Sequence, residues 1–201
     1  KNNMSITDPK KVDEVLTRGV EEVIEVDHLR TKLLSGKQLR IKFGIDPTGS
    51  SIHIGHAVPL RKLKQFQDLG HTVILLIGDY TAQIGDPTGR DQTRPLLSSE
   101  TIKENMMTYV TQAAKVLDIE KTEIRYNSEW YGIPNFSHLL MQLTSHITVA
   151  RILERDDFQK RLKEGSDIQM QEIMYPLLQG YDSVALRADV EIGGTDQKFN
   201  L

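Results

Sequence analysis

The sequence contains no cysteine. This absence excludes disulfide bonds, metal sites made of thiolates and a cysteine nucleophile. An excess of positive charge is also missing, because 25 Lys and Arg are balanced by 28 Asp and Glu, for a formal net charge of −3. Domains dedicated to binding nucleic acid are usually basic. We therefore expect these 201 residues to hold RNA weakly on their own.

Long apolar runs are absent too. The longest, Val73 to Ile77, is far shorter than the ~20 residues that cross a bilayer. Residues 1–4 lack the apolar region of a signal peptide. We therefore expect no contact with membranes. The remaining composition, with 38% hydrophobic and 26% charged residues, is ordinary for one globular domain with a substantial buried core.

Short apolar runs alternate with amphipathic stretches along the chain. This pattern is typical of an α/β domain with a mostly parallel sheet. The apolar runs predict strands over 39–45, 72–77, 122–126 and 190–192. Apolar residues spaced three to four apart predict helices over about 53–69, 102–117, 136–143, 158–162 and 167–186. The expected division is a helical segment over residues 1–38 and an α/β domain over 39–201.

Cap and turn residues make the helix boundaries more specific. The segment Thr101-Ile102-Lys103-Glu104 fits a capping box, so a helix is expected to begin at Thr101. Pro59 is compatible with a helix in its first turn, and Gly70 is suited to end that helix. Pro176 lacks a backbone donor and is expected to interrupt or kink the last helix.

A first candidate site follows the first predicted strand. Asp46-Pro47-Thr48-Gly49 forms a tight turn, and His53-Ile54-Gly55-His56 then begins a helix. Ligands of open parallel sheets lie at the carboxyl ends of strands, where the N–H groups of a helix N-terminus attract phosphate. His53 and His56 share one helix face and can donate hydrogen bonds to phosphate oxygens. Gly55 lets a flat ring approach the backbone.

The spacing of these histidines fits two other interpretations. A capped helix with two surface histidines accounts for it equally well. Histidines and carboxylates also bind zinc, although no third ligand stands at helical spacing from His53 and His56.

A second candidate site lies in the last predicted helix. Tyr175, Gln179 and Asp182 are four and then three residues apart, which places them on one helix face. Their neighbours are apolar, and a partly buried polar stripe is costly unless it has partners. The stripe predicts either a ligand site or a polar network that joins this helix to a neighbour.

Two glycine-containing turns complete the set. Gly193-Gly194-Thr195-Asp196-Gln197 follows the last strand, where glycines allow close approach to a ligand and an aspartate can pair with a ribose hydroxyl. Gly85-Asp86-Pro87-Thr88-Gly89 reads by itself as a type I turn.

These motifs resemble those of the class I aminoacyl-tRNA synthetases, which share a His-x-Gly-His motif after the first strand of a Rossmann-like sheet. The Asp46–Gly49 turn is similar to the tyrosyl and tryptophanyl branch, and the segment from Tyr175 to Asp182 is similar to the tyrosyl enzymes. The resemblance covers nearly the whole chain from Leu39 onward. It implies a Rossmann-like parallel sheet flanked by helices.

The resemblance also implies a role for each matching residue. Contacts to the ATP phosphates are implied for Thr48, His53 and His56, and contacts to the adenylate for Asp46, Gly55, Gly194 and Asp196. Contacts to tyrosine are implied for Asp86, Tyr175, Gln179, Asp182 and Gln197. One position departs from the family: Lys42 stands where many members have a tyrosine that binds the substrate hydroxyl, so Asp182 is expected to act alone or with another donor.

The implied activity is the activation of L-tyrosine with ATP to tyrosyl-adenylate, followed by transfer to tRNA(Tyr). Mg²⁺ would arrive with ATP, and no tightly bound protein metal is expected. The family implies a cytoplasmic homodimer, with the interface expected around residues 135–153. Three alternatives remain open: a tryptophanyl enzyme, a class I-like nucleotidyltransferase and a catalytically idle binding relative. Pyrophosphate exchange that depends on an amino acid would separate them.

A second phosphate-contacting loop of this branch, of the Lys-Met-Ser-Lys-Ser type, has no match in these residues. We therefore expect residues 39–201 to be a catalytic domain that is incomplete at its C-terminus. Residues 1–201 alone are expected to form little adenylate and not to charge tRNA. A basic cluster of Arg155, Lys160, Arg161 and Lys163 is interleaved with acidic residues, which predicts a solvated helix face.

Overall fold

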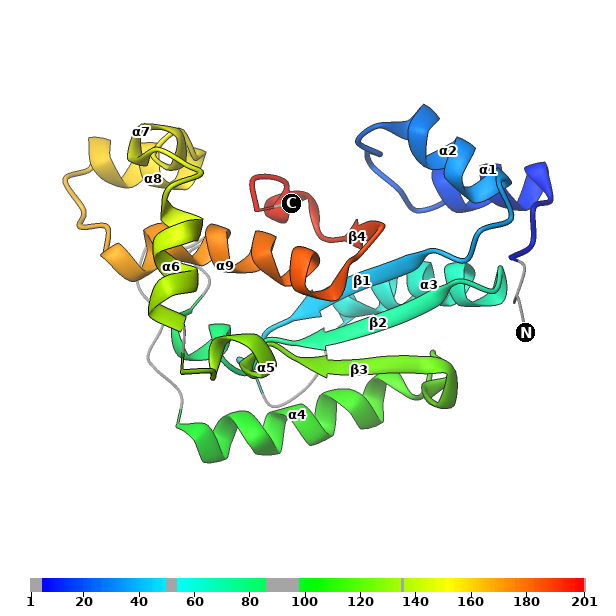
Figure 1. Cartoon of the computed structure of the whole chain (residues 1–201), viewed down its shortest axis with the longest axis horizontal. Coiled ribbons are helices and arrows are strands. Elements are labelled where there is room, and N and C mark those ends of the chain that lie inside the picture. The colour runs from blue at the N-terminus through cyan, green and yellow to red at the C-terminus, as the bar shows by residue number, and fades with distance from the viewer. Residues whose placement is uncertain (1–4, 50–53, 86–97, 135, 201) are drawn as a thin grey trace.

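The computed structural model describes residues 5–49, 54–85, 98–134 and 136–200. Four parallel strands form one sheet in the order β3-β2-β1-β4 (Figure 1). The strands are β1 (Arg40–Ile45), β2 (Thr72–Ile77), β3 (Thr122–Tyr126) and β4 (Val190–Ile192). All four strands predicted from the apolar runs are confirmed, each to within one residue.

Strand β2 lies inside the sheet and is buried on both faces. Its alternate residues Val73, Leu75 and Ile77 belong to the larger hydrophobic core. The residues between them, Ile74 and Leu76, belong to a second core on the opposite face. This division follows from the two-residue period of a strand, and burial on both faces explains why the whole run is apolar.

Helices of the first half of the chain supply the larger core. They are α1 (Pro9–Thr17), α2 (Val26–Leu34), α3 (Ile54–Asp68) and α4 (Ser99–Ala113). Residues 1–38 were expected to be helical, and the helices α1 and α2 lie within them, with Val12 and Leu33 fully buried. Lys62 of α3 holds α1 in place, because its Nζ donates to the carbonyls of Val15 and Arg18 at 2.7 Å each.

The second core lies between the sheet and helices of the second half. Those that contribute to it are α5 (Ser128–Tyr131), α6 (Phe136–Thr144) and α9 (Met170–Leu186), and the chain between α6 and α9 also forms α7 (Val149–Ile152) and α8 (Asp156–Lys163). Short 3-10 turns are η1 (Thr81–Gln83), η2 (Ile119–Lys121) and η3 (Thr195–Gln197). Figure 1 shows α9 running along the sheet beside β4, with α6, α7 and α8 gathered around its N-terminal half.

Three predicted helix boundaries are wrong, and one of them is the end of α4, which lies at Ala113 and not near residue 117. Helix α4 begins at Ser99, and its cap is Ser98, whose side chain accepts from the backbone N–H of Thr101 at 3.2 Å. Thr101 is therefore inside the helix, because the residue that caps lies three positions earlier. Helix α9 begins at Met170 and continues through Pro176 as one helix. Its capping box of Gln169 and Glu172 explains the later start.

Pro59 lies in the second turn of α3, not in the first as predicted. A proline there lacks the N–H that would bond to the carbonyl four residues earlier. The helix continues because Leu60, Leu63 and Phe66 beyond the proline are all buried in the larger core. The predicted end of this helix at Gly70 is confirmed: its φ is +88°, which glycine adopts readily.

Candidate active site

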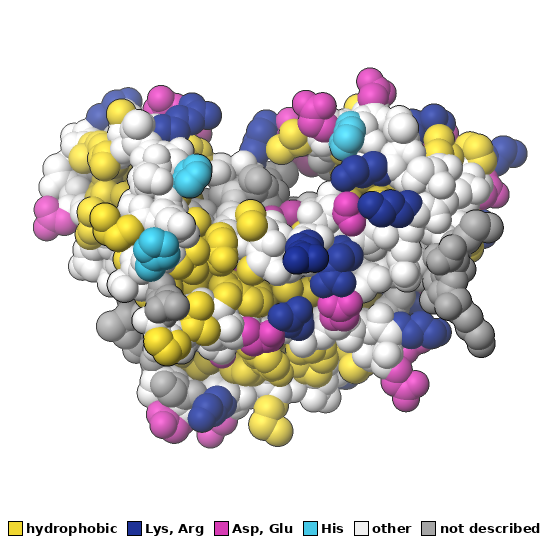
Figure 2. Space-filling model, in the orientation of Figure 1, with side chains coloured by type: hydrophobic (Ala, Val, Ile, Leu, Met, Phe, Trp, Pro, Cys, Tyr) yellow, Lys and Arg dark blue, Asp and Glu magenta, His cyan; other side chains and the backbone are white. Residues whose placement is uncertain are grey.

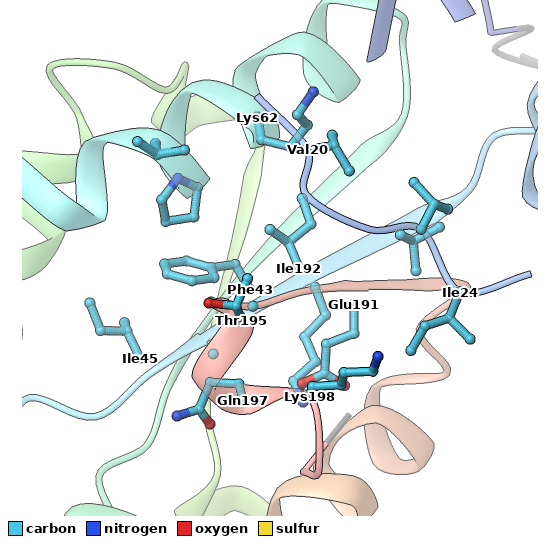
Figure 3. A pocket seen from close by; sticks show the side chains of 18 of the residues that line it. Val20, Ile24, Phe43, Ile45, Lys62, Glu191, Ile192, Thr195, Gln197 and Lys198 are labelled. Carbon is cyan, nitrogen blue, oxygen red and sulfur yellow. Dashed lines mark hydrogen bonds and ion pairs between the residues drawn. The ribbon is translucent and has the colours of Figure 1, made fainter. Parts of the chain in front are cut away.

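One cavity of about 950 Å³ is lined by predicted site residues that the structure describes, and Figure 3 shows one of them, Gln197, in its wall. Its walls come from β1, β4, the start of α3, one face of α9 and the segment after α1. Every predicted site residue whose side chain the structure describes lines it: Asp46, Thr48, Gly55, His56, Tyr175, Gln179, Asp182, Gly194 and Gln197. Figure 2 shows the molecule hollowed between the α7–α8 side and the α1–α2 side.

Three predicted site residues fall partly or wholly outside the described structure. His53 and Asp86 lie outside the described residues, and the backbone of Asp196 lies in η3 while its side chain is not described. Their roles stay predictions.

Asp46, at the end of β1, lies at the centre of a hydrogen-bond network. The hydroxyl of Tyr175 donates to Asp46 Oδ2 at 2.8 Å, and the hydroxyl of Thr81 donates to Asp46 Oδ1 at 2.8 Å. Asp46 was expected near the adenylate and Tyr175 near the substrate amine. Because their side chains are directly bonded, these two parts of the predicted site are one continuous surface.

Asp182 forms the closed end of the same network. Its side chain is 4% exposed and accepts from Trp130 Nε1 at 2.9 Å and from Asn127 Nδ2 at 3.3 Å. Asn127 Nδ2 also donates to Thr81 Oγ1 at 2.9 Å, which connects Asp182 to Asp46. Burial raises the pKa of Asp182 to about 6, while the positive charge of Lys42 acts to lower it.

Lys42 is fully buried beside this network, on β1. Its Nζ lies 2.7 Å from Glu191 Oε1, and donates to Ser183 Oγ at 3.0 Å and to the carbonyl of Gln179 at 3.3 Å. A buried ammonium is tolerable when its charge and its donors are all matched in this way. Lys42 therefore ties α9 to β1 and β4, and the donors that accompany Asp182 are instead Trp130 and Asn127.

The turn after β1 is held from behind by α4. Asn105 Nδ2 donates to the carbonyl of Pro47 at 2.8 Å, and the N–H of Thr48 donates to the carbonyl of Asp46 at 2.8 Å. Helix α3 begins directly beyond this region, with His56 in its first turn and its ring 6.4 Å from that of Tyr109. A helix start beside a hydroxyl and an imidazole is suited to bind phosphate.

Gly78, at the end of β2, is what allows Asp46 and Thr81 to meet. A Cβ at this position would lie 1.9 Å from Asp46 Oδ1 and 2.4 Å from Thr81 Oγ1. Such contacts are far inside van der Waals distance, so any side chain would displace the carboxylate. Sequence reasoning did not identify Gly78, Thr81, Asn127 or Trp130, because none belongs to a recognised motif.

Replacing Gly78 with alanine is therefore expected to destabilise the protein by about 1–3 kcal/mol, the usual cost of overpacking, and to weaken the tyrosine binding that the sequence resemblance implies. Gly180→Ala is the matched control, because a Cβ at Gly180 meets nothing within 4 Å and alanine favours a helix. Thermal unfolding and calorimetric titration measure both effects. If Gly78→Ala left both the stability and the tyrosine affinity unchanged, Asp46 would not be confined by its contact with Gly78.

The segment after α1 is a further part of the site that sequence reasoning missed. Residues 19–25 line the cavity, and Figure 3 shows Val20 and Ile24 around the same space as Ile192. An ion pair of 2.7 Å between Glu22 and Lys198 joins this segment to the chain just after η3. The two paired residues lie 176 positions apart in the sequence, so no local pattern could reveal the pair.

The prediction that the basic cluster lies on a solvated helix face is wrong for two of its four residues. Arg155 and Arg161 are 5% and 3% exposed, whereas Lys160 and Lys163 are exposed as expected. Arg161 pairs with the buried Glu172 at 2.6 Å. Side chains of α8 thus reach α9 and, through Arg155, the end of the described chain.

Metal and membrane sites were also sought in the structure. Among residues 5–49, 54–85, 98–134 and 136–200, no three side chains of His, Asp or Glu are grouped so that they could hold a metal ion. No helix in these ranges has the length and apolarity needed to cross a bilayer.

Comparison with known proteins identifies the class to which this fold and cavity belong. A family model described as tRNA synthetases class I (W and Y) matches residues 34–201, and the chain belongs to this family.

Tyrosine–tRNA ligases are among the proteins to which the chain is similar. The chain is 54% identical over 192 residues to the one from Dehalococcoides mccartyi strain CBDB1, covering 95% of this chain and 48% of that protein. It is 58% identical over 191 residues to the one from Burkholderia thailandensis, covering 93% and 46%. It therefore spans about half the length of the curated relatives it matches.

A solved structure shares the fold closely. The mitochondrial tyrosyl-tRNA synthetase of Aspergillus nidulans, truncated at its C-terminus, superposes with a TM-score of 0.83 at 28% identity, covering 94% of this chain and 58% of that one. The expected Rossmann-like arrangement of a parallel sheet flanked by helices is thereby confirmed.

Proposed function

We propose that this chain carries the site that activates L-tyrosine with ATP to form tyrosyl-adenylate, for transfer to tRNA(Tyr). The observation that carries the proposal is the buried Asp182 in the wall of a cavity that also bears Tyr175 and Gln179. A carboxylate there can accept the hydrogen of a phenol. The family and the names of the similar proteins support tyrosine as the amino acid.

The amino acid would lie along one face of α9. Its phenol would donate to Asp182, and its ammonium would bond to Tyr175 and Gln179, together with Asp86. Gln197 of η3 would contact the carboxylate side. The support for this arrangement is that Tyr175, Gln179, Asp182 and Gln197 all line the same cavity.

The nucleotide would lie across the end of β1 and the turn after β4. Thr48, His53 and His56 would donate to its phosphates at the start of α3. Asp46, Gly55, Gly194 and Asp196 would contact the adenosine, with Mg²⁺ carried in by ATP. The described members of this set that line the cavity support the assignment.

The reaction follows from this arrangement. A carboxylate oxygen of tyrosine attacks the α-phosphorus of ATP, a new P–O bond forms, and the bond to pyrophosphate breaks. No side-chain nucleophile or base is required, because the carboxylate is already ionised at neutral pH. The side chains act by holding the two substrates in line and by stabilising charge on the phosphates.

Tyrosine affinity is expected to depend on pH through Asp182. If the ionised carboxylate accepts the phenol, affinity is full above a pH of about 6 and falls as the pH drops below that value, by about tenfold per unit. The phenol itself does not titrate in this range. Calorimetric titration with tyrosine alone, between pH 5 and 8, measures the effect.

Asp182→Asn is the control for this titration, because it removes the titrating group and should abolish the pH dependence. An affinity independent of pH in the unsubstituted protein would show that the Asp182 carboxylate does not bind the phenol. Tighter binding of tryptophan than of tyrosine would favour the tryptophanyl alternative.

The active form is proposed to be a cytoplasmic homodimer with tRNA(Tyr) as its partner. In support, α6 has no buried residue in the isolated chain, and its Met141 is 70% exposed. Sedimentation equilibrium of the protein expressed from its complete coding sequence tests this, and a monomer at micromolar concentration would contradict it.

A further inference from the structure

Asn105 is a buried amide on α4, behind the turn that follows β1. It is 7% exposed, and its neighbours one helical turn away on the same face, Ile102 and Tyr109, are each 3% exposed. A buried amide on an apolar helix face is costly unless it is bonded. Its Nδ2 donates to the carbonyl of Pro47 at 2.8 Å, a bond between residues 58 positions apart. Asn105 therefore has its partner in the turn, although it does not line the cavity.

Hydrogen-bond chemistry fixes which end of this amide faces the turn. A carbonyl oxygen only accepts, so the nitrogen of Asn105 must face Pro47. The carbonyl of Pro47 and the N–H of Thr48 belong to one planar peptide unit and point in opposite directions. The N–H of Thr48 donates to the carbonyl of Asp46 at 2.8 Å. This peptide unit is therefore bonded at both of its polar groups, once within the turn and once to α4.

The torsion that these two bonds restrain is ψ of Pro47. The proline ring already fixes φ at about −65°, so ψ is the soft torsion through which the peptide unit between Pro47 and Thr48 could turn. Turning it would break the bond to Asn105 and the bond to Asp46. Pro47 is buried, whereas Thr48 is half-buried and lines the cavity. The bond from Asn105 thus sets where Thr48 stands in the cavity wall.

The same face of α4 also reaches the start of α3. Tyr109 lies four residues after Asn105, and its ring is 6.4 Å from that of His56. A Cβ on Gly49 would lie 3.6 Å from the hydroxyl oxygen of Tyr109, so this hydroxyl stands beside the end of the turn. Neighbouring turns of α4 therefore back both elements that carry the proposed phosphate donors Thr48 and His56.

We propose that Asn105 is a positioning residue, which fixes the peptide unit between Pro47 and Thr48 and thereby holds the Thr48 hydroxyl in place for the phosphates of ATP. This inference rests on the proposed function, since it takes ATP as the ligand of Thr48. A donor that is already in place when charge develops on the phosphates needs no reorganisation during the reaction. Helix α4 thus contributes to the reaction although none of its described residues lines the cavity.

Asn105→Leu tests the proposal on the protein expressed from its complete coding sequence. Leucine keeps the branched shape and suits the apolar face, but it cannot donate to Pro47. The rate of adenylate formation, measured by rapid quench, should fall roughly 10–100-fold, because a small misplacement of a group that holds the substrate is enough for such a loss. Tyrosine affinity, measured by calorimetric titration, should stay within about twofold, because the proposed amino acid site lies on α9.

A double-mutant cycle shows whether Asn105 acts through Thr48. Thr48→Val removes the hydroxyl and keeps the shape of the side chain. If Asn105 positions this hydroxyl, Asn105→Leu should lower the rate by less than about twofold in a protein that already carries Thr48→Val. A purely structural role would lower the rate by the same factor in both backgrounds. Met107→Ala, on the exposed side of α4, is the control and should change neither the rate nor the affinity.

Three results would overturn the inference: an unchanged rate in Asn105→Leu, an equal loss of rate and of tyrosine affinity, or losses that multiply in the double variant. If Asn105→Leu does not fold, Asn105→Ala removes the amide without adding volume, and the same three results apply to it. Failure of the proposed function looks different, because the unsubstituted protein itself would then form no adenylate from tyrosine and ATP.

Discussion

Replacing Asp182 with alanine should remove most of the preference for tyrosine over phenylalanine. The carboxylate is buried and accepts from Trp130 and Asn127, and a phenol would complete its partners. Phenylalanine has no hydroxyl, so it would leave the buried Asp182 carboxylate without this donor. Sites that bond a substrate hydroxyl reject the analogue lacking it by about 10⁴–10⁵-fold, a figure established on tyrosyl-tRNA synthetases themselves.

The measurement is kcat/KM for pyrophosphate exchange with each amino acid, since the ratio of the two constants is the selectivity. Asp167→Ala is a suitable control, because this aspartate is exposed before the start of α9 and lies outside the cavity. If the Asp182→Ala protein discriminated between tyrosine and phenylalanine as well as the unsubstituted protein, Asp182 would be excluded from hydroxyl recognition.

Replacing His56 with alanine should lower the rate of adenylate formation by roughly 10²–10³-fold, the usual effect of losing one donor to developing charge. Tyrosine affinity should hardly change, because the proposed amino acid site lies on α9, away from the start of α3. Rapid-quench measurement of adenylate, together with equilibrium tyrosine titration, separates the two quantities.

His53→Ala should behave in the same way if the two histidines act together on the phosphates. The opposite result, a normal rate with poor tyrosine binding, would assign His56 to the amino acid instead. Zinc that co-purifies in equal proportion with the protein and is lost from both variants would contradict a phosphate role.

The sheet could be predicted from the sequence because its strands are buried on both faces. A run such as Val73 to Ile77 in β2 has to be apolar throughout, and its length distinguishes it from a helix. The predicted site residues were also recognisable, because turns at the carboxyl ends of parallel strands converge on one edge of the sheet. Their collection in one cavity follows from that topology.

The partners of those residues could not be predicted. Asp182 bonds to Asn127 and Trp130, which lie 55 and 52 positions away and have no motif of their own. The requirement for glycine at Gly78 depends on two side chains that meet only in three dimensions. Arg155 looked like a solvated residue because acidic neighbours surround it in sequence, and its burial results from the packing of α8 against the end of the chain.

The central claim is that this site activates tyrosine, and tyrosine-dependent exchange of pyrophosphate into ATP tests it most directly. The protein expressed from its complete coding sequence should catalyse exchange with tyrosine, and at least ~10⁴-fold less efficiently with phenylalanine. Tryptophan should support little exchange. Exchange that required tryptophan, that needed no amino acid or that did not occur with tyrosine would contradict the account.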